Sequence, residues 1–534
     1  MTKLQKFSVV LSTLMAATAA CSLAACTNKP SDTSYGYDDD FTYYQEMVMN
    51  SEKKLYVFNR SESLSFDELV LAEAIQGIYA RTDAKYYLYT SGSYETWLDD
   101  LVDNYGFTTE DITLEEMVAD YIADYGNGYV LYDRETLPET VNCACSIAGV
   151  TNYLPVDKSL QSAAEGYGLE LKVDASEMTE MECFSQYKDQ LNNTGLVQID
   201  NELTYMRDYG IACGYFFIWR EGLDSEDLMF RGEVHDWVEE NSPVFGWVPN
   251  DEAQDVTVAS QYGQFVLASD YCYNMTVFAC KNAFGEFSFT QPNKSTQVVA
   301  EQGKHYVCIM MSDGDNLQTW YNTFPFSSSY LAAERGDFAM GWSLSPSLSD
   351  LGQNVLNYIQ RNAADSDYYV CSVSGQGYIY PQVYPDLEAY TKGLSSYLRR
   401  MDMSVVQILD SGYSASVIEA YSKIPELTGG IYCYGNKYQE GNGSVYWAND
   451  KPFVSIRESL WNADVAAMAQ RINNYAKDPT SIEGYTAINL HPWSMTYQDV
   501  EELVSLLDDD VVVVTADDFI RLITENVPHV DVIR

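Results

Sequence analysis

The sequence has few basic residues. Its 534 residues include 31 Lys and Arg against 78 Asp and Glu, which gives a formal net charge of −47 at pH 7. Nucleic acids and anionic membrane surfaces are bound through Lys and Arg side chains that neutralise phosphate. The balance therefore predicts no nucleic-acid partner. It also disfavours a polyanionic polysaccharide as substrate and favours a neutral partner.

Histidine is scarce too, and no His-x-x-x-His pair occurs among the four histidines, His235, His305, His491 and His529. A metal-dependent deacetylase usually holds its metal with a carboxylate and two histidines, so this class is disfavoured. The phosphate-binding GxxxxGK[ST] loop, the GxSxG nucleophile elbow and the HExxH zinc motif are also missing. The chain thus lacks the short signatures of several large enzyme classes.

Long apolar runs are missing beyond the first 20 residues. The start combines basic Lys3 and Lys6 with a short apolar run at 7–20, and LAAC at 23–26 matches the bacterial lipobox. We therefore expect a signal peptide at 1–25, lipidation of Cys26, and a flexible polar and acidic tether at 26–41. A lipid anchor would hold the protein at the bacterial cell envelope, outside the cytoplasm.

Nine of the eleven cysteines lie beyond this leader, and an odd number leaves at least one unpaired. Several of them, such as Cys308, Cys371 and Cys433, fall inside apolar strand-like runs. We predict that these are small buried apolar residues rather than halves of disulfides.

Residues 301–534 alternate between apolar strand-like runs and helix-like segments. Because each run is continuously apolar, it predicts a parallel sheet covered on both faces. The count predicts a (β/α)8 TIM-barrel-like domain or a close seven-stranded relative, with an open doubly wound sheet as the rival. The eight runs are HYVCIMM (305–311), FAMGWSL (338–344), YYVCSVS (368–374), SVVQILD (404–410), GGIYCYG (429–435), FVSIRES (453–459), YTAINLH (485–491) and VVVVTAD (511–517).

Residues 42–300 alternate less regularly and predict two or three small α/β subdomains. Ser65 to Glu68 and Thr113 to Glu116 have the pattern of capping boxes that open helices. Two segments here, GWVPNDE (246–252) and ASDYCYN (268–274), offer Trp247, Glu252, Asp270 and Asn274. These four side chains either reach the barrel rim or are ordinary turn residues, and we favour turns.

Polar residues gather where the C-terminal runs end, and active sites of barrels lie at the carboxyl ends of the strands. Cleavage of a glycosidic bond needs a proton donor and a second carboxylate as base or nucleophile. Glu458 is the favoured acid. A turn with a helix N-cap is the alternative explanation for Asp313 to Asn316, and a structural role is the alternative for Arg457 and Glu458. The catalytic candidates are Asp313, Asp315, Asp410 and Glu458.

No metal or other cofactor is required by this pattern. Asp313, Asp315 and Asn316 nevertheless offer the oxygen ligands that Ca²⁺ or Mg²⁺ prefers. Side chains near the same strand ends that suit sugar binding are Trp342, Arg457, His491 and Trp493.

The stretch SGQGYIYPQVYP (374–385) combines two glycines, two prolines and three tyrosines. Glycine frees the backbone and proline stiffens it, so the loop can hold Tyr378 and Tyr380 against sugar faces. Residues 375–381 match GxGYxYP letter for letter, and the chain resembles the bacterial glycoside hydrolase family named for that motif. That family also carries several small domains ahead of the motif-bearing domain. The resemblance implies a carbohydrate-related role and supplies no catalytic pair.

Two functions remain open at this point. The first is a glycoside hydrolase that acts on a neutral oligo- or polysaccharide at the cell surface by carboxylate acid/base catalysis. The second is a non-catalytic glycan-binding surface lipoprotein, in which the same aromatic side chains bind sugar and the carboxylates accept hydrogen bonds from hydroxyls.

Overall fold

The computed structural model describes residues 41–220, 225–247, 252–292 and 298–534. The leader, nearly all of the tether and Cys26 lie outside the described residues. The described residues belong to one compact unit. Among them, no helix is both long and apolar enough to cross a membrane.

The chain begins with two small three-stranded parallel sheets. The first has the strand order β2-β1-β3 and the second the order β5-β4-β6. Both capping boxes expected from the sequence form, at Ser65 and Glu68 before α2 and at Thr113 and Glu116 before α4. The bounds are β1 Lys54–Phe58, α2 Phe66–Ala80, β2 Tyr86–Leu88, α3 Ser93–Tyr105, β3 Thr108–Asp111, α4 Leu114–Tyr125, β4 Gly128–Tyr132, α5 Thr140–Thr151, β5 Leu154–Asp157, α6 Gln161–Gly166, β6 Glu170–Asp174 and α7 Glu180–Tyr187.

A third, four-stranded parallel sheet follows, with the strand order β10-β9-β7-β8. Strand β10 (Phe265–Leu267) and helix α10 (Glu252–Gln261) of this unit form hydrogen bonds with residues 378–380 of the GxGYxYP loop. The bounds are β7 Leu196–Gln198, α8 Arg207–Cys213, β8 Phe216–Ile218, α9 Ser225–Trp237, β9 Pro243–Gly246, α10 Glu252–Gln261, β10 Phe265–Leu267 and α11 Met275–Phe278.

The C-terminal part is built on one large sheet with the order β16-β17-β15-β14-β13-β12-β11-β19-β18, while β20 pairs with β11. All pairs are parallel except β16 with β17. The bounds are β11 His305–Met311, α12 Leu317–Tyr321, β12 Met340–Leu344, α13 Leu348–Leu351, α14 Gln353–Arg361, β13 Asp367–Cys371, α15 Leu387–Arg400, β14 Val405–Asp410, α16 Ala415–Ser422, β15 Gly429–Tyr434, β16 Val445–Ala448, β17 Lys451–Val454, β18 Glu458–Leu460, α17 Val465–Asn473, β19 Tyr485–Leu490, α18 Tyr497–Ser505, β20 Val511–Val514 and α19 Ala516–Asn526.

This sheet is curled: one short stretch of chain supplies β17, next to one end of the strand order, and β18, at the other end. The run expected at 453–459 divides into β17, which pairs with β15, and β18, which pairs with β19. Only residues 455–457 separate the two. The mixed α/β class is confirmed. A complete eight-stranded TIM barrel stays a prediction, since the eighth expected strand, β20, joins β11 beside β12.

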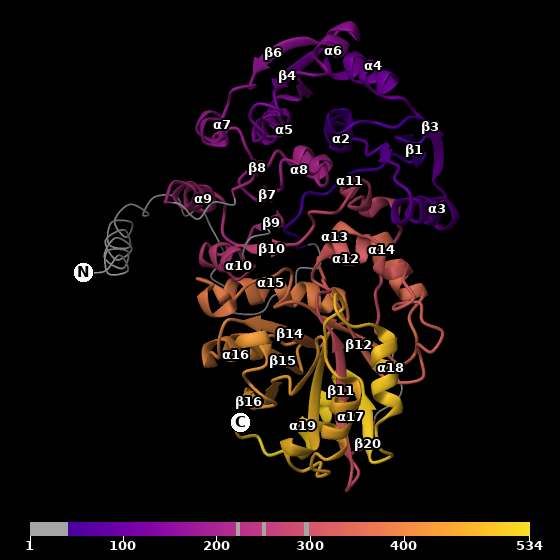
Figure 1. Ribbon diagram of the computed structural model, residues 1–534, viewed down its shortest axis with the longest axis vertical. Coiled ribbons are helices and arrows are strands. Elements are labelled where there is room, and N and C mark those ends of the chain that lie inside the picture. Colours follow the sequence, from indigo (N-terminus) through magenta and orange to yellow (C-terminus); the bar gives the residue numbers. More distant parts are fainter. Residues whose placement is uncertain (1–40, 221–224, 248–251, 293–297) are drawn as a thin grey trace, which may run out of the picture. The chain divides into compact units, whose positions relative to one another are not determined.

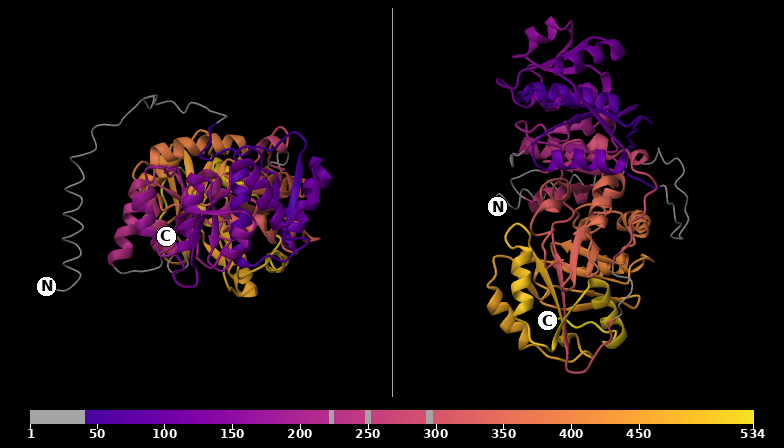
Figure 2. Two further views of the ribbon diagram at one scale, coloured as in Figure 1. Left: turned by 90° about the horizontal axis from the view of Figure 1, so that it is seen from above. Right: turned by 90° about the vertical axis from the view of Figure 1, so that its right-hand side faces the viewer.

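Helices cover the outside of the curled sheet, among them α15, α16 and α18 (Figure 1). Figure 2 shows the C-terminal part, in orange and yellow, from two further directions, with helices beside its strands. Every residue of β11, β12, β13, β14, β15 and β19 is buried, as expected for parallel strands covered on both faces. The nine cysteines beyond the leader are all free and buried, which confirms that they are packing residues.

Candidate active site

A cavity of about 260 Å³ lies at the carboxyl ends of the curled sheet. We call it the carboxylate cavity. Its lining comes from the residues that follow β11, β13, β18 and β19, from strands β14, β15 and β19, and from the region of α10 in the third N-terminal unit. The lining residues are Trp247, Glu252, Ser312, Asp313, Asp315, Asn316, Gln318, Val373, Tyr378, Gln407, Leu409, Cys433, Tyr438, Trp461, Asn489, His491 and Trp493.

The turn after β11 brings two carboxyl groups to this cavity. The Gly314 N–H donates a hydrogen bond of 2.7 Å to Ser343 Oγ. A Cβ at position 314 would lie 1.8 Å from the Ser343 carbonyl oxygen, so only glycine fits this close approach. Asp313 adopts a left-handed backbone with φ of 64°. The strained turn places Asp313 and Asp315, two of the four predicted catalytic residues, on one wall of the cavity.

Burial raises the pKa of both carboxyl groups. Burial raises the pKa of Asp315 to about 8, and the neighbouring charges of Asp313 and Glu252 add to the rise. Burial also raises the pKa of Asp313, against the lowering effects of a Ser312 hydrogen bond and of His491. At neutral pH the pair therefore keeps a proton that a solvent-exposed aspartate would have lost.

A third carboxylate enters the cavity from α10. Glu252 Oε1 accepts hydrogen bonds from the Tyr378 hydroxyl at 2.8 Å and from the Tyr438 hydroxyl at 2.9 Å. Trp247 stacks near Tyr378, with ring centroids 6.3 Å apart. Our preference for a turn role at Trp247 and Glu252 is thus wrong, because both line the cavity. Asn274 is a turn residue, with φ of 55° and hydrogen bonds to the backbone of Leu88.

The GxGYxYP loop joins the curled sheet to the third N-terminal unit. The Tyr378 N–H donates to the Val266 carbonyl on β10 at 2.8 Å, and the Val266 N–H donates back to the Tyr378 carbonyl at 3.0 Å. The Tyr380 N–H donates to Ser260 Oγ on α10 at 2.9 Å. Tyr380 is buried and does not line the cavity, whereas Tyr378 does. Much of the motif is therefore structural, and the Tyr378 hydroxyl connects it to the site.

We predict that Gly377→Ala weakens both the fold and the site. The added Cβ would lie 2.7 Å from the Val266 carbonyl oxygen, so the loop must move off β10. Overpacking of this kind costs about 1–3 kcal/mol in the free energy of unfolding, which urea denaturation measures. Gly412→Ala is the matched control, since its nearest neighbour would lie at an ordinary 3.7 Å. Equal stability of the two variants would contradict the role assigned to the motif.

Two more predicted residues, His491 and Trp493, line the cavity beyond β19. The His491 ring stacks on Trp461 with centroids 4.1 Å apart and planes 3° from parallel. The Trp493 side chain is 62% exposed, which is unusual for tryptophan in a folded protein. These aromatic faces suit the C–H faces of a sugar ring.

Sequence reasoning missed the polar floor of the cavity. Gln407 on β14 donates from Nε2 to Asn489 Oδ1 on β19 at 3.2 Å. Both residues are buried and line the cavity. The available signal was a polar residue inside an otherwise apolar strand, because such a group is retained where it has a partner or a ligand.

Four other predicted site residues lie elsewhere. Trp342 on β12 is buried, and its indole N–H donates to Asp367 at 2.8 Å. Asp410 is buried near Tyr432, whose hydroxyl donates to it at 3.2 Å, and burial raises the pKa of Asp410 to about 7. Neither lines the carboxylate cavity.

Arg457 and Glu458 do not line it either. Glu458 accepts from the Arg471 guanidinium at 2.7 and 3.0 Å and from the Tyr475 hydroxyl at 2.5 Å. Arg457 lies over the Tyr475 ring at 3.6 Å and pairs with Glu483 at 3.4 Å. Their partners make these two residues part of an ion-pair and aromatic cluster beside α17.

Within the described residues, no group of three or more His, Cys, Asp or Glu is placed to hold a metal ion. The cation site predicted at Asp313, Asp315 and Asn316 stays a prediction. Asn316 Nδ2 donates to the Asp313 carbonyl oxygen at 3.2 Å, which leaves its Oδ1 as the atom that would face a cation.

Protonation of Asp315 makes the stability depend on pH. Burial raises the pKa of both Asp315 and Glu180 to about 8, far above the unfolded values, so the folded state binds more protons and stability falls as pH rises toward 8. The lowered pKa of about 4 of His235 and His305 opposes this trend only below pH 6.5. We expect Asp315→Asn to reduce the loss of unfolding free energy between pH 6.5 and 8 by about 1 kcal/mol per pH unit. Urea unfolding at several pH values measures this, and parallel curves for wild type and variant would contradict it.

The fold and the site define a mixed α/β protein with a carboxylate-rich, aromatic cavity at the carboxyl ends of its main sheet. The family comparison agrees with this class: the chain belongs to the GxGYxYP family. Residues 54–123, 126–193 and 194–280 match the first, second and third domains of that family, and residues 303–524 match the "GxGYxYP putative glycoside hydrolase C-terminal domain".

A solved structure has a similar fold. It is described as the "Crystal structure of a putative hydrolase from Bacteroides thetaiotaomicron", with a TM-score of 0.83 and 24% sequence identity. The match covers 92% of this chain and 98% of that one. No curated protein matches the chain. At this identity the likeness shows the shared fold.

Proposed function

We propose that the protein is a glycoside hydrolase that cleaves a neutral glycan by carboxylate acid/base catalysis. The observation that carries the proposal is the convergence of Asp313, Asp315 and Glu252 on one cavity lined by aromatic side chains. Hydrolysis of a glycosidic bond needs two carboxyl groups in different protonation states, and aromatic faces bind sugar rings. The description of the family as glycoside hydrolases supports the same reading.

The roles follow from the environments of the three groups. Asp315 has the pKa raised to about 8 and is the general acid that protonates the leaving oxygen. Glu252 accepts hydrogen bonds from two phenols, which fix its position, and serves as base or nucleophile. The negative charge of Asp313 helps to raise the pKa of Asp315. Trp461, Trp493 and Tyr378 hold the sugar.

The neutral character of the substrate rests on charge. None of the described residues that line the carboxylate cavity is Lys or Arg, while three are carboxylates. An anionic sugar would meet repulsion with no compensating cation, and the net charge of −47 adds to that repulsion.

The test is the release of new reducing ends. The chain starting just after Cys26 is incubated with a panel of neutral gut and plant glycans. Release from at least one neutral glycan is expected. Binding of a glycan in calorimetry without release from any panel member would overturn catalysis and leave the glycan-binding protein. Preferential release from uronic acid polymers would overturn the neutral substrate.

We also propose that Cys26 carries a lipid that anchors the protein at the bacterial cell envelope, which the lipobox at 23–26 supports. Two acyl chains on one residue give stable membrane attachment. Cys26→Ser is expected to move the protein from the membrane fraction to the soluble fraction and to abolish incorporation of labelled palmitate. Cys21→Ser, which replaces the other cysteine of the leader, is the control. Unchanged labelling of the Cys26 variant would contradict the anchor.

A further inference from the structure

A larger cavity adjoins the carboxylate cavity. It has a volume of about 820 Å³ and is lined by parts of segments 90–94, 318–329 and 490–497, by Tyr205, Tyr271 and Tyr273, and by Met311 and Trp342. We call it the neutral cleft. Gln318 and Trp493 line both cavities, so the two adjoin at these side chains.

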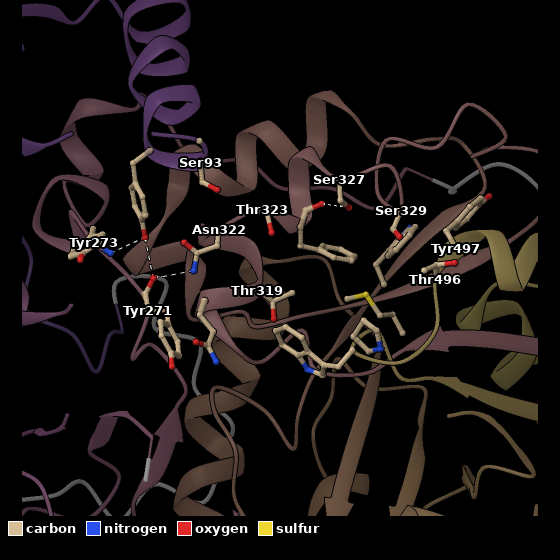
Figure 3. A pocket seen from close by; sticks show the side chains of 18 of the residues that line it. Ser93, Tyr271, Tyr273, Thr319, Asn322, Thr323, Ser327, Ser329, Thr496 and Tyr497 are labelled. Atoms are coloured by element: carbon tan, nitrogen blue, oxygen red, sulfur yellow. Dashed lines mark hydrogen bonds between the residues drawn. The ribbon is translucent and has the colours of Figure 1, made fainter. Parts of the chain in front are cut away.

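The lining of the neutral cleft carries no formal charge. None of its described lining residues is Asp, Glu, Lys, Arg or His, although a fifth of the whole chain is charged. Hydroxyl and amide groups are abundant instead, including Ser93, Thr319, Asn322, Thr323 and Ser329, which lie around the cavity with three tyrosines (Figure 3). Such groups pair with sugar hydroxyls in both directions, as donors and as acceptors.

Aromatic side chains stand at both sides of the cleft. On one side Tyr205 stacks on Tyr273 with centroids 4.2 Å apart, and Tyr271 lies 5.2 Å from Tyr205. On the other side Trp342 stacks near Tyr497 with centroids 6.1 Å apart. The predicted sugar-binding residue Trp342 therefore lines this cleft and not the carboxylate cavity.

The Tyr271 segment is held in place by hydrogen bonds. The Tyr94 hydroxyl accepts from the Tyr273 N–H at 2.7 Å and donates to the Tyr271 carbonyl at 3.4 Å, and Asn322 Nδ2 donates to the same carbonyl at 3.0 Å (Figure 3). The Tyr271 side chain is 45% exposed. A fixed backbone with an exposed ring gives a preorganised stacking surface, which lowers the entropy cost of binding.

We propose that the neutral cleft binds an extended, uncharged oligosaccharide chain whose scissile bond lies over Asp313 and Asp315. This inference rests on the proposed function and deepens it, since it assigns the substrate as a chain rather than a single sugar or a disaccharide. Ligand pockets commonly measure about 300–1,000 Å³, so the cleft has room for more than one sugar ring beyond the carboxylate cavity. Thr319 on α12 links the two, because it lines the cleft and donates to the Asp313 carbonyl at 3.3 Å.

The experiment uses the chain starting after Cys26 and neutral gluco-, xylo-, manno- and galacto-oligosaccharides of two to eight units, with oligogalacturonides as the charged counterpart. In the wild type, kcat/KM is expected to rise at least tenfold from the disaccharide to the hexasaccharide of the preferred series. Thr323→Trp, which fills the cleft, is expected to lower kcat/KM on the hexasaccharide at least tenfold more than on the disaccharide. The matched control is Ser328→Trp, an exposed neighbour outside the lining.

Binding to the otherwise unreactive Asp315→Asn variant separates this proposal from the hydrolase proposal. Weaker hexasaccharide binding in calorimetry when Thr323→Trp is added supports the cleft even if no hydrolysis is found. Three results would overturn binding of a chain in the cleft: a kcat/KM that is independent of chain length, equal losses of kcat/KM on short and long substrates, or a preference for oligogalacturonides. Any turnover would still support the hydrolase proposal. Tyr271→Ala is the second variant and removes a stacking face without filling the cleft; an unchanged hexasaccharide KM would count against the proposal.

Discussion

Asp315→Asn is expected to lower kcat by about 100- to 10,000-fold, the usual contribution of a positioned general acid. Asp315 is buried in the strained turn after β11. Burial raises its pKa to about 8, so it holds a proton at neutral pH. An amide has the same shape and cannot deliver that proton to a leaving oxygen. Because the neutral acid is also replaced by a neutral group, the variant is expected to fold with at least wild-type stability near pH 7.

Asp410→Asn is the matched control for this result. Asp410 ends strand β14 of the same sheet, is fully buried and has a pKa raised to about 7, but it does not line the carboxylate cavity. Its replacement is expected to change kcat less than about threefold. Comparable losses of kcat in the two variants would mean that buried carboxyl groups of the curled sheet affect activity through stability. Asp315 would then not be the general acid.

Glu252→Gln is expected to cause a loss of similar size in kcat, about 100- to 10,000-fold. The Tyr378 and Tyr438 hydroxyls donate to this carboxyl group, and the amide keeps an acceptor for them but cannot act as base or nucleophile. Glu252 is exposed, so the melting temperature is expected to change little. Steady-state kinetics and thermal unfolding of the same preparation measure both effects.

Glu239→Gln replaces another exposed carboxylate of the same N-terminal unit, outside the cavity, and is expected to behave as wild type. A Glu252→Gln enzyme with full activity would confine catalysis to the C-terminal part of the chain. It would leave the third N-terminal unit with a purely structural role at the GxGYxYP loop.

Local sequence patterns predicted the C-terminal sheet well, because parallel strands buried on both faces appear as continuous apolar runs. The run HYVCIMM coincides with β11, and the other seven overlap strands of the same sheet. The Asp313 to Asn316 turn was also predicted, since a glycine between acidic residues after a strand marks a tight turn at the carboxyl end of that strand. The two capping boxes were also predicted correctly, because their hydrogen bonds span only three residues of the chain.

What the sequence could not supply is side-chain direction and contact between distant segments. Glu458 lies at the end of an apolar run as Asp410 does, yet its carboxylate turns to Arg471 on α17, thirteen residues ahead. Glu252 reaches Tyr378 across 126 residues of chain, and nothing local in GWVPNDE distinguishes it from a turn residue. The sequence predicted the motif tyrosines as sugar contacts. The packing of Gly377 against β10 and of Tyr380 against α10 depends on the tertiary structure, which the local sequence does not show.

The most direct test of the central claim is a crystal structure of Asp315→Asn with an oligosaccharide from the glycan that wild type cleaves. We predict a glycosidic oxygen within about 3 Å of the substituted side chain at position 315, the reach of a general acid. We also predict that Glu252 lies on the opposite side of the same sugar ring and that further units run past Trp493 into the neutral cleft. A sugar chain that binds elsewhere, or that leaves positions 313, 315 and 252 without contact, would contradict it.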